Sequence, residues 1–232
     1  MLEYSSGLDK NNNRTWFHET HKEYEKARAD FTALCDMTRF AIADCSPELA
    51  KDIMFMQPKD WIYRTARDMR YYRDMPPYNP AFRAYISPDR RSRRPIGYYM
   101  RICPGTSCFG TGLWCETTAE MNSVREFISE NHTELAMLLA ESGLTISGEK
   151  VKTMPRGWSD TNPAAELIKH KEWMLIIDIP DEELTTFDAF DSLVRSTVER
   201  MEPIRLFLLR AARGEKTQKQ LFEEFYSAGI SF

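Results

Sequence analysis

Helical periodicity at both ends of the chain encloses a middle of short strand-like runs, and this order limits the possible folds most strongly. After the asparagine triplet at 11–13, apolar residues follow 3–4 spacing, which predicts one asparagine-capped helix over about 13–44. A second apolar face runs from Phe187 to Ala211. It predicts a helix that is kinked at Pro203 and followed by Gly214 at its C-terminal cap.

The middle of the chain has the pattern of short runs and turn residues that is typical of an antiparallel sheet. Short aromatic or β-branched runs, separated by proline, glycine and aspartate, predict strands over 53–56, 61–63, 82–86, 96–103 and 107–114. Pro104-Gly105 predicts the turn of a hairpin. The later pattern predicts a helix capped at Thr117, a helix from 131 to Gly143, strands within 144–152, a short helix over 162–169 and a buried strand over 173–179.

Together these elements predict one α+β domain, with a central antiparallel sheet flanked by long N- and C-terminal helices. The chain has 232 residues and no composition shift that would mark a linker, so we expect a single domain over 1–214. Residues 215–232 have apolar side chains at helical spacing, which predicts a helical tail.

The cysteines and the apolar runs indicate a cytoplasmic protein. Five scattered cysteines, an odd number, favour reduced thiols over a disulfide framework. The first residues lack a basic and then apolar leader, and no apolar run approaches the roughly 20 residues of a membrane-spanning helix. We therefore expect no membrane segment.

Positive charge is concentrated in one segment. Residues 63–101 contain ten arginines, three aspartates, no lysine and no glutamate, so this segment carries +7 while the remainder carries −11. It also holds seven of the ten tyrosines. Guanidinium groups bind phosphate or carboxylate through a planar fork and stack on aromatic rings.

Four sequence blocks carry a family resemblance. They are N-N-N-R-T-W-F at 11–17, R-T-A-R-D-M-R-Y-Y-R-D-M-P-P-Y at 64–78, the tyrosine-rich segment 97–113, and P-R-G-W at 155–158. In this order they resemble an uncharacterised family, domain of unknown function twenty-four sixty-one. Its signature is R-x-x-R-D-x-R-F-S-x-x-K-x-P-Y-K. The resemblance implies a shared fold and a shared site but no known chemistry.

The resemblance and the charge pattern together define the candidate site residues. The ligand-binding candidates are Arg64, Arg67, Asp68, Arg70, Tyr78, Asn12, Arg14 and Arg156. Tyr72 replaces the serine of the family signature, while Met75 and Asn79 replace its two lysines. If the family binds an anion through those lysines, this member binds it more weakly or binds a different ligand. Asp68 is expected to orient arginines rather than act as a base, because neighbouring arginines lower a carboxylate's pKa.

Three interpretations of the arginines remain open. The first is a small phosphate- or carboxylate-bearing ligand in an Arg/Tyr-rich pocket. The second is an interaction module whose basic face, with Arg90, Arg91, Arg93 and Arg94, meets an acidic protein or nucleic acid. Net acidity disfavours strong non-specific nucleic-acid binding. The third is a purely structural role.

The sequence identifies no catalytic residue and no cofactor, so whether the protein is an enzyme stays open. A metal site is not expected. His18 and His21 are three residues apart, whereas a zinc-binding helix of the H-E-x-x-H type needs histidines four apart. Gly110-Thr111-Gly112 lacks the third glycine of a dinucleotide fingerprint and predicts a bulge or a close backbone approach instead.

Overall fold

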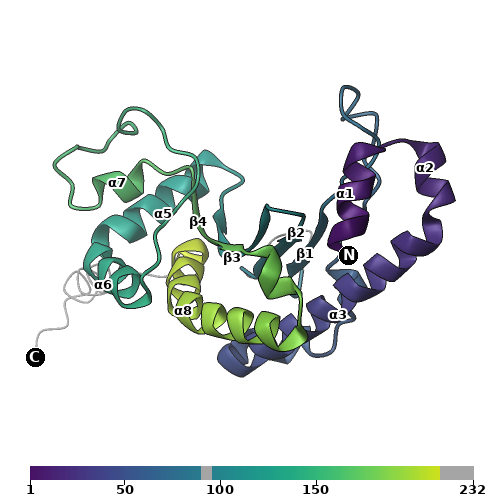
Figure 1. The fold of residues 1–232 in the computed structure, drawn as a ribbon. Coiled ribbons are helices and arrows are strands. Elements are labelled where there is room, and N and C mark those ends of the chain that lie inside the picture. Colours follow the sequence, from purple (N-terminus) through teal and green to yellow (C-terminus); the bar gives the residue numbers. More distant parts are fainter. Residues whose placement is uncertain (90–95, 215–232) are drawn as a thin grey trace, which may run out of the picture. The chain divides into compact units, whose positions relative to one another are not determined.

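The structure, a computed structural model, describes residues 1–89 and 96–214 (Figure 1). The described part of the chain has an α+β fold, with eight α-helices and a four-stranded antiparallel sheet in the order β1-β2-β3-β4. The N-terminal helices are α1 (Leu2–Lys10), α2 (Arg14–Glu19), α3 (His21–Cys45) and α4 (Pro47–Ile53). The others are α5 (Thr118–Glu130), α6 (His132–Ser142), α7 (Ala165–Ile168) and α8 (Phe187–Arg213). The strands are β1 (Phe82–Ile86), β2 (Tyr98–Ile102), β3 (Ser107–Trp114) and β4 (Glu172–Ile179).

The chain divides into two compact units. Among the described residues, the first unit holds Met1–Gly110 and Ile176–Glu199, and the second holds Thr111–Leu175 and the residues that follow Glu199. The single domain expected over residues 1–214 stays a prediction.

In the first unit, one face of β1 and β2 forms the core with α3. Side chains alternate between buried and half-buried along both strands, as expected for a two-sided sheet. The buried face packs on the buried stripe of α3: the rings of Phe31 and Phe82 are 5.6 Å apart, and the Thr38 hydroxyl lies 3.9 Å from the sulfur of Met100. The opposite face of these strands therefore carries their half-buried residues, which include arginines and tyrosines.

In the second unit, the guanidinium of Arg125 holds the turn between α7 and β4. Arg125 is buried on α5, and its Nε and Nη2 donate to the backbone carbonyls of Ile168 and His170 at 2.8 and 3.1 Å. On β3, Gly112 lies against the backbone of β4, because a Cβ there would be 2.5 Å from the carbonyl oxygen of Trp173. The close approach predicted for this glycine is confirmed.

Most predicted elements are confirmed near their expected bounds. β1 and β3 have the predicted limits, and β2 is shorter than predicted by two residues at its start and one at its end. The caps are also as predicted: Asn13 accepts from the Trp16 amide at 2.9 Å, and Thr117 accepts from the Glu120 amide at 3.2 Å. Gly143 and Gly214 follow their helices with φ of 64° and 63°.

Four expectations about local structure were wrong. The helix expected over 13–44 is α2 and α3, separated at Thr20, and α1 was not predicted. Residues 53–56 end α4 and form a turn instead of a strand. Residues 61–63 and 144–152 form only isolated bridges, at Ile62 and at Ser147 and Lys150. The predicted tail, 215–232, lies outside the described residues.

Candidate functional site

The segment that resembles the family signature is a loop closed by backbone pairing. Its first residues follow the edge of β1: Ile62 bridges Ala84, and the Tyr63 amide donates to the Arg83 carbonyl at 2.9 Å. The loop then closes where Ala66 bridges Tyr78. We call residues 67–77 the signature loop.

Asn12 fixes the end of the signature loop to the N-terminal helices. Its Nδ2 donates to the Tyr78 carbonyl and its Oδ1 accepts from the Tyr78 amide, both at 3.0 Å. The Phe17 ring stacks on the Tyr78 ring, with centroids 4.1 Å apart and planes inclined by 10°. Two of the four blocks noted in the sequence, 11–17 and 64–78, therefore meet at Tyr78.

Arg67 binds backbone carbonyls rather than a carboxylate. Its Nη1 donates to the carbonyl oxygen of Pro76 at 2.7 Å and also to that of Tyr78. Burial, together with the nearby charge of Arg83, lowers the pKa of Arg67. In this arrangement the guanidinium holds the two ends of the signature loop together.

Asp68 and Arg70 form an exposed ion pair inside the signature loop. Their closest contact joins Arg70 Nη2 and Asp68 Oδ2 at 2.6 Å, and Asp68 also accepts from the Arg70 amide at 3.1 Å. These hydrogen bonds hold the pKa of Asp68 below its usual value and raise that of Arg70. Asp68 is therefore a poor proton acceptor near neutral pH, as expected from the sequence.

The other candidates do not join this cluster. Arg64 and Arg14 are exposed, and neither has a hydrogen-bond or ion-pair partner among the residues described. Arg156 belongs to the second unit, in an exposed turn where Gly157 has a φ of 91°. Arg90, Arg91, Arg93 and Arg94 lie outside the described residues. The structure thus brings together Asn12, Arg67 and Tyr78.

A second set of arginines and tyrosines lies on the half-buried face of β1 and β2. Antiparallel pairing places Arg83 opposite Arg101 and Tyr85 opposite Tyr99. The Arg83 guanidinium also lies 5.5 Å from the centre of the Tyr63 ring. We call these five residues the Arg/Tyr face. The candidates named from the sequence did not include them, although the i, i+2 spacing in both strands is a signal for one shared face.

The Arg/Tyr face has an excess of positive charge. Among the described residues neither Arg83 nor Arg101 pairs with a carboxylate; Arg101 donates to the Thr106 carbonyl at 3.0 Å, and the buried Nε of Arg83 has no hydrogen-bond partner. Like charges directly opposite in a sheet destabilise it. A bound anion would remove this repulsion.

The pKa shifts of the neighbours follow from burial and from these charges. Burial raises the pKa of Tyr99, and the charges of Arg83 and Arg101 offset this in part. Burial also raises the pKa of Cys108 on β3, which lies near the cation of Arg101 and the carboxylate of Asp178. Tyr99 is therefore a neutral hydrogen-bonding group at neutral pH.

Within the ranges 1–89 and 96–214, no group of three or more histidine, cysteine, aspartate or glutamate side chains is arranged to hold a metal ion. Among the helices of the same ranges, none combines the length and the apolarity that crossing a membrane requires.

Comparison with known proteins identifies one family. A family model described as "Conserved hypothetical protein (DUF2461)" matches residues 1–207. The searches of curated proteins and of solved structures found no significant match.

Proposed function

The chain belongs to the DUF2461 family of conserved hypothetical proteins, and we propose that it binds a small phosphate- or carboxylate-bearing molecule on the Arg/Tyr face of β1 and β2. The observation that carries the proposal is the pair Arg83 and Arg101, which lie directly opposite each other without a carboxylate partner in the described residues.

Two guanidinium groups on adjacent strands suit a bidentate or tridentate anion. Each offers several N–H donors in one plane, which match the oxygens of phosphate or carboxylate. The pairing in register holds the two residues at neighbouring positions of the rigid sheet. Tyr63 and Tyr99 supply ring surface beside the arginines, on which a planar part of the ligand can stack.

The signature loop has a positioning role in this proposal. Arg67 and Asn12 fix the loop that continues from Tyr63, and Tyr63 in turn pairs with β1 and contacts Arg83. The proposal does not need the cations that Met75 and Asn79 replace. Met75 is exposed, and Asn79 Oδ1 accepts from the Ala81 amide at 3.0 Å in a local turn.

Calorimetric titration with inorganic pyrophosphate and with citrate tests the proposal. Charge-assisted hydrogen bonds contribute about 1.5–3 kcal/mol, so we expect Arg83→Gln and Arg101→Gln each to raise Kd by about tenfold or more. The matched control is Arg28→Gln on α3, the helix on the opposite face of β1, which should leave Kd unchanged.

Nuclear magnetic resonance locates the bound anion. The Nε–H signals of Arg83 and Arg101, assigned by their loss in the two variants, should shift on titration while that of Arg28 stays in place. The proposal is wrong if neither anion binds at low ionic strength, or if all three variants weaken binding equally.

A further inference from the structure

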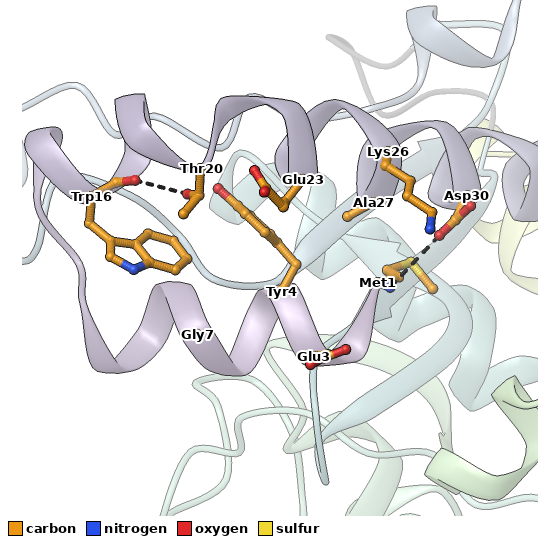
Figure 2. A pocket seen from close by; sticks show the side chains of 10 residues that line it. All are labelled: Met1, Glu3, Tyr4, Gly7, Trp16, Thr20, Glu23, Lys26, Ala27 and Asp30. Carbon is orange, nitrogen blue, oxygen red and sulfur yellow. Dashed lines mark hydrogen bonds and ion pairs between the residues drawn. The ribbon is translucent and has the colours of Figure 1, made fainter.

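A cavity of about 490 Å³ lies between α1 and the helices α2 and α3 in the first unit (Figure 2). The wall formed by α2 and α3 consists of side chains spaced three or four residues apart, which include Trp16, Thr20 and Glu23. Its α1 wall includes Tyr4 and Gly7. Neither the family description nor the anion proposal uses this cavity.

The end of the cavity near Trp16 is aromatic. The Tyr4 and Trp16 rings are 5.5 Å apart with planes inclined by 36°. Gly7 allows the indole to lie directly on α1, since a Cβ at this position would be 3.2 Å from the Trp16 ring. Such ring faces attract cations through their quadrupoles.

The Tyr4 hydroxyl is a buried polar group that makes no hydrogen bond of normal geometry in the described residues, although it interacts with the Thr20 side chain. Tyr4 is 8% exposed, and its hydroxyl is fully buried. It points toward the space between Thr20 and Glu23 (Figure 2). The Thr20 hydroxyl donates to the Trp16 carbonyl at 2.8 Å. Burial raises the pKa of Tyr4, and the interaction with the Thr20 side chain offsets this only in part, so the phenol is neutral and its oxygen can accept a hydrogen bond.

The charged side chains that line the cavity are distributed unevenly along it. At one end, the Met1 amino nitrogen lies 3.8 Å from the Asp30 carboxylate. Lys26, one turn before Asp30 on α3, lines the same end. Glu3 and Glu23 also line the cavity, and neither has an ion-pair partner within the described ranges. The walls beside Tyr4 therefore combine carboxylates, an acceptor oxygen and two aromatic rings.

We infer that this cavity binds a small protonated amine, with the ammonium between Glu23 and the Tyr4 hydroxyl and the aliphatic part against Trp16. The ammonium donates one hydrogen bond to the Glu23 carboxylate and one to the phenol oxygen, and the rings stabilise its remaining charge. The inference is independent of the anion proposal, because it uses different residues and a ligand of opposite charge.

The test is a titration with n-butylammonium chloride that follows the indole N–H signal of Trp16, assigned by its loss in Trp16→Phe. We expect the signal to shift with saturation at millimolar concentration. Neutral n-butanol, which has the same chain without the charge, should not shift it. The idea is overturned if the amine causes no shift, or if the alcohol binds as well as the amine.

Two variants and one control identify the polar contacts. Glu23→Gln should weaken amine binding about tenfold, because it removes the charge that receives the ammonium, and Tyr4→Phe should weaken it severalfold. Glu19→Gln on α2 removes an exposed carboxylate outside the cavity lining and should leave Kd unchanged. Equal effects of Glu19→Gln and Glu23→Gln would overturn the assignment. Equal thermal unfolding midpoints establish that the variants are folded.

Discussion

The carboxamide of Asn12 satisfies both backbone polar groups of a residue 66 positions away, the buried Tyr78. The Tyr78 carbonyl also accepts from Arg67, whereas Asn12 is the partner of its amide. Asn12→Ala should therefore leave the Tyr78 N–H unsatisfied and lower the free energy of unfolding by about 1–3 kcal/mol. Urea denaturation followed by circular dichroism measures the loss.

The control at this scale is Asn11→Ala. Asn11 is exposed and its Nδ2 donates only to the Gly7 carbonyl one turn earlier, so its loss should cost no more than about 0.5 kcal/mol. If both variants lower the free energy of unfolding equally, the side-chain carboxamide of Asn12 does not fix the signature loop.

Sequence reasoning found Asn12 and Tyr78 but missed Arg83 and Arg101. The first two stood out because they belong to the blocks that resemble the family. Arg83 and Arg101 look like any other members of the arginine-rich segment, and only the strand register places them opposite each other. Register depends on pairing between distant residues, which local composition does not reveal.

At the scale of elements, the pairing of β3 with β4 depends on Gly112. A Cβ here would lie 2.5 Å from the Trp173 carbonyl oxygen and 2.8 Å from the Met174 Cα, both of which are backbone atoms. Gly112→Ala should therefore force the strands apart and lower the free energy of unfolding by about 1–3 kcal/mol, the range for overpacking. Hydrogen exchange should show faster opening of the Trp173 and Met174 amides.

Thr106→Ala provides the comparison, because Thr106 is exposed in the turn before β3 and its hydrogen bonds within the described residues involve only its backbone. It should change the free energy of unfolding by no more than about 0.5 kcal/mol. A Gly112→Ala protein as stable as Thr106→Ala would contradict the close approach of the two strands.

A clear period made an element easier to predict than a short apolar run did. β1 alternates between buried and half-buried residues and was predicted to the residue. Residues 53–56 form a short apolar run that fits either a strand or a helix end; Phe55 is in fact 89% exposed in a turn after α4. The break at Thr20, where the backbone leaves helical dihedral angles (φ −102°, ψ 24°), is not marked by the apolar spacing.

At the scale of the whole molecule, the sequence predicted an α+β chain but not which distant segments form a compact unit. The first unit combines 1–110 with 176–199. The later segment contributes buried Ile179, Phe190, Val194 and Val198. The periodicity of one segment does not reveal that it packs with the other, because their association rests on burial and on a few long-range polar contacts.

Those contacts predict that residues 1–110 do not fold alone. The Asp181 carboxylate accepts from the Gly105 amide at 3.1 Å, and Arg195 pairs with Asp44 on α3. Full burial of each large apolar side chain contributes about 1.5–3 kcal/mol, so losing four of them approaches the total stability of about 5–15 kcal/mol of a typical domain.

The fragment 1–110 should therefore show no cooperative urea transition and should bind the dye ANS, which reports exposed apolar surface. A single chain that joins 1–110 to 176–199 through a Gly/Ser linker should regain a cooperative transition and lose ANS binding. Replacing Asp181 and Arg195 by alanine in this joined chain should lower its urea midpoint, since both long-range contacts are then absent. A fragment 1–110 that unfolds as cooperatively as the joined chain would show that the later segment is not part of this folding unit.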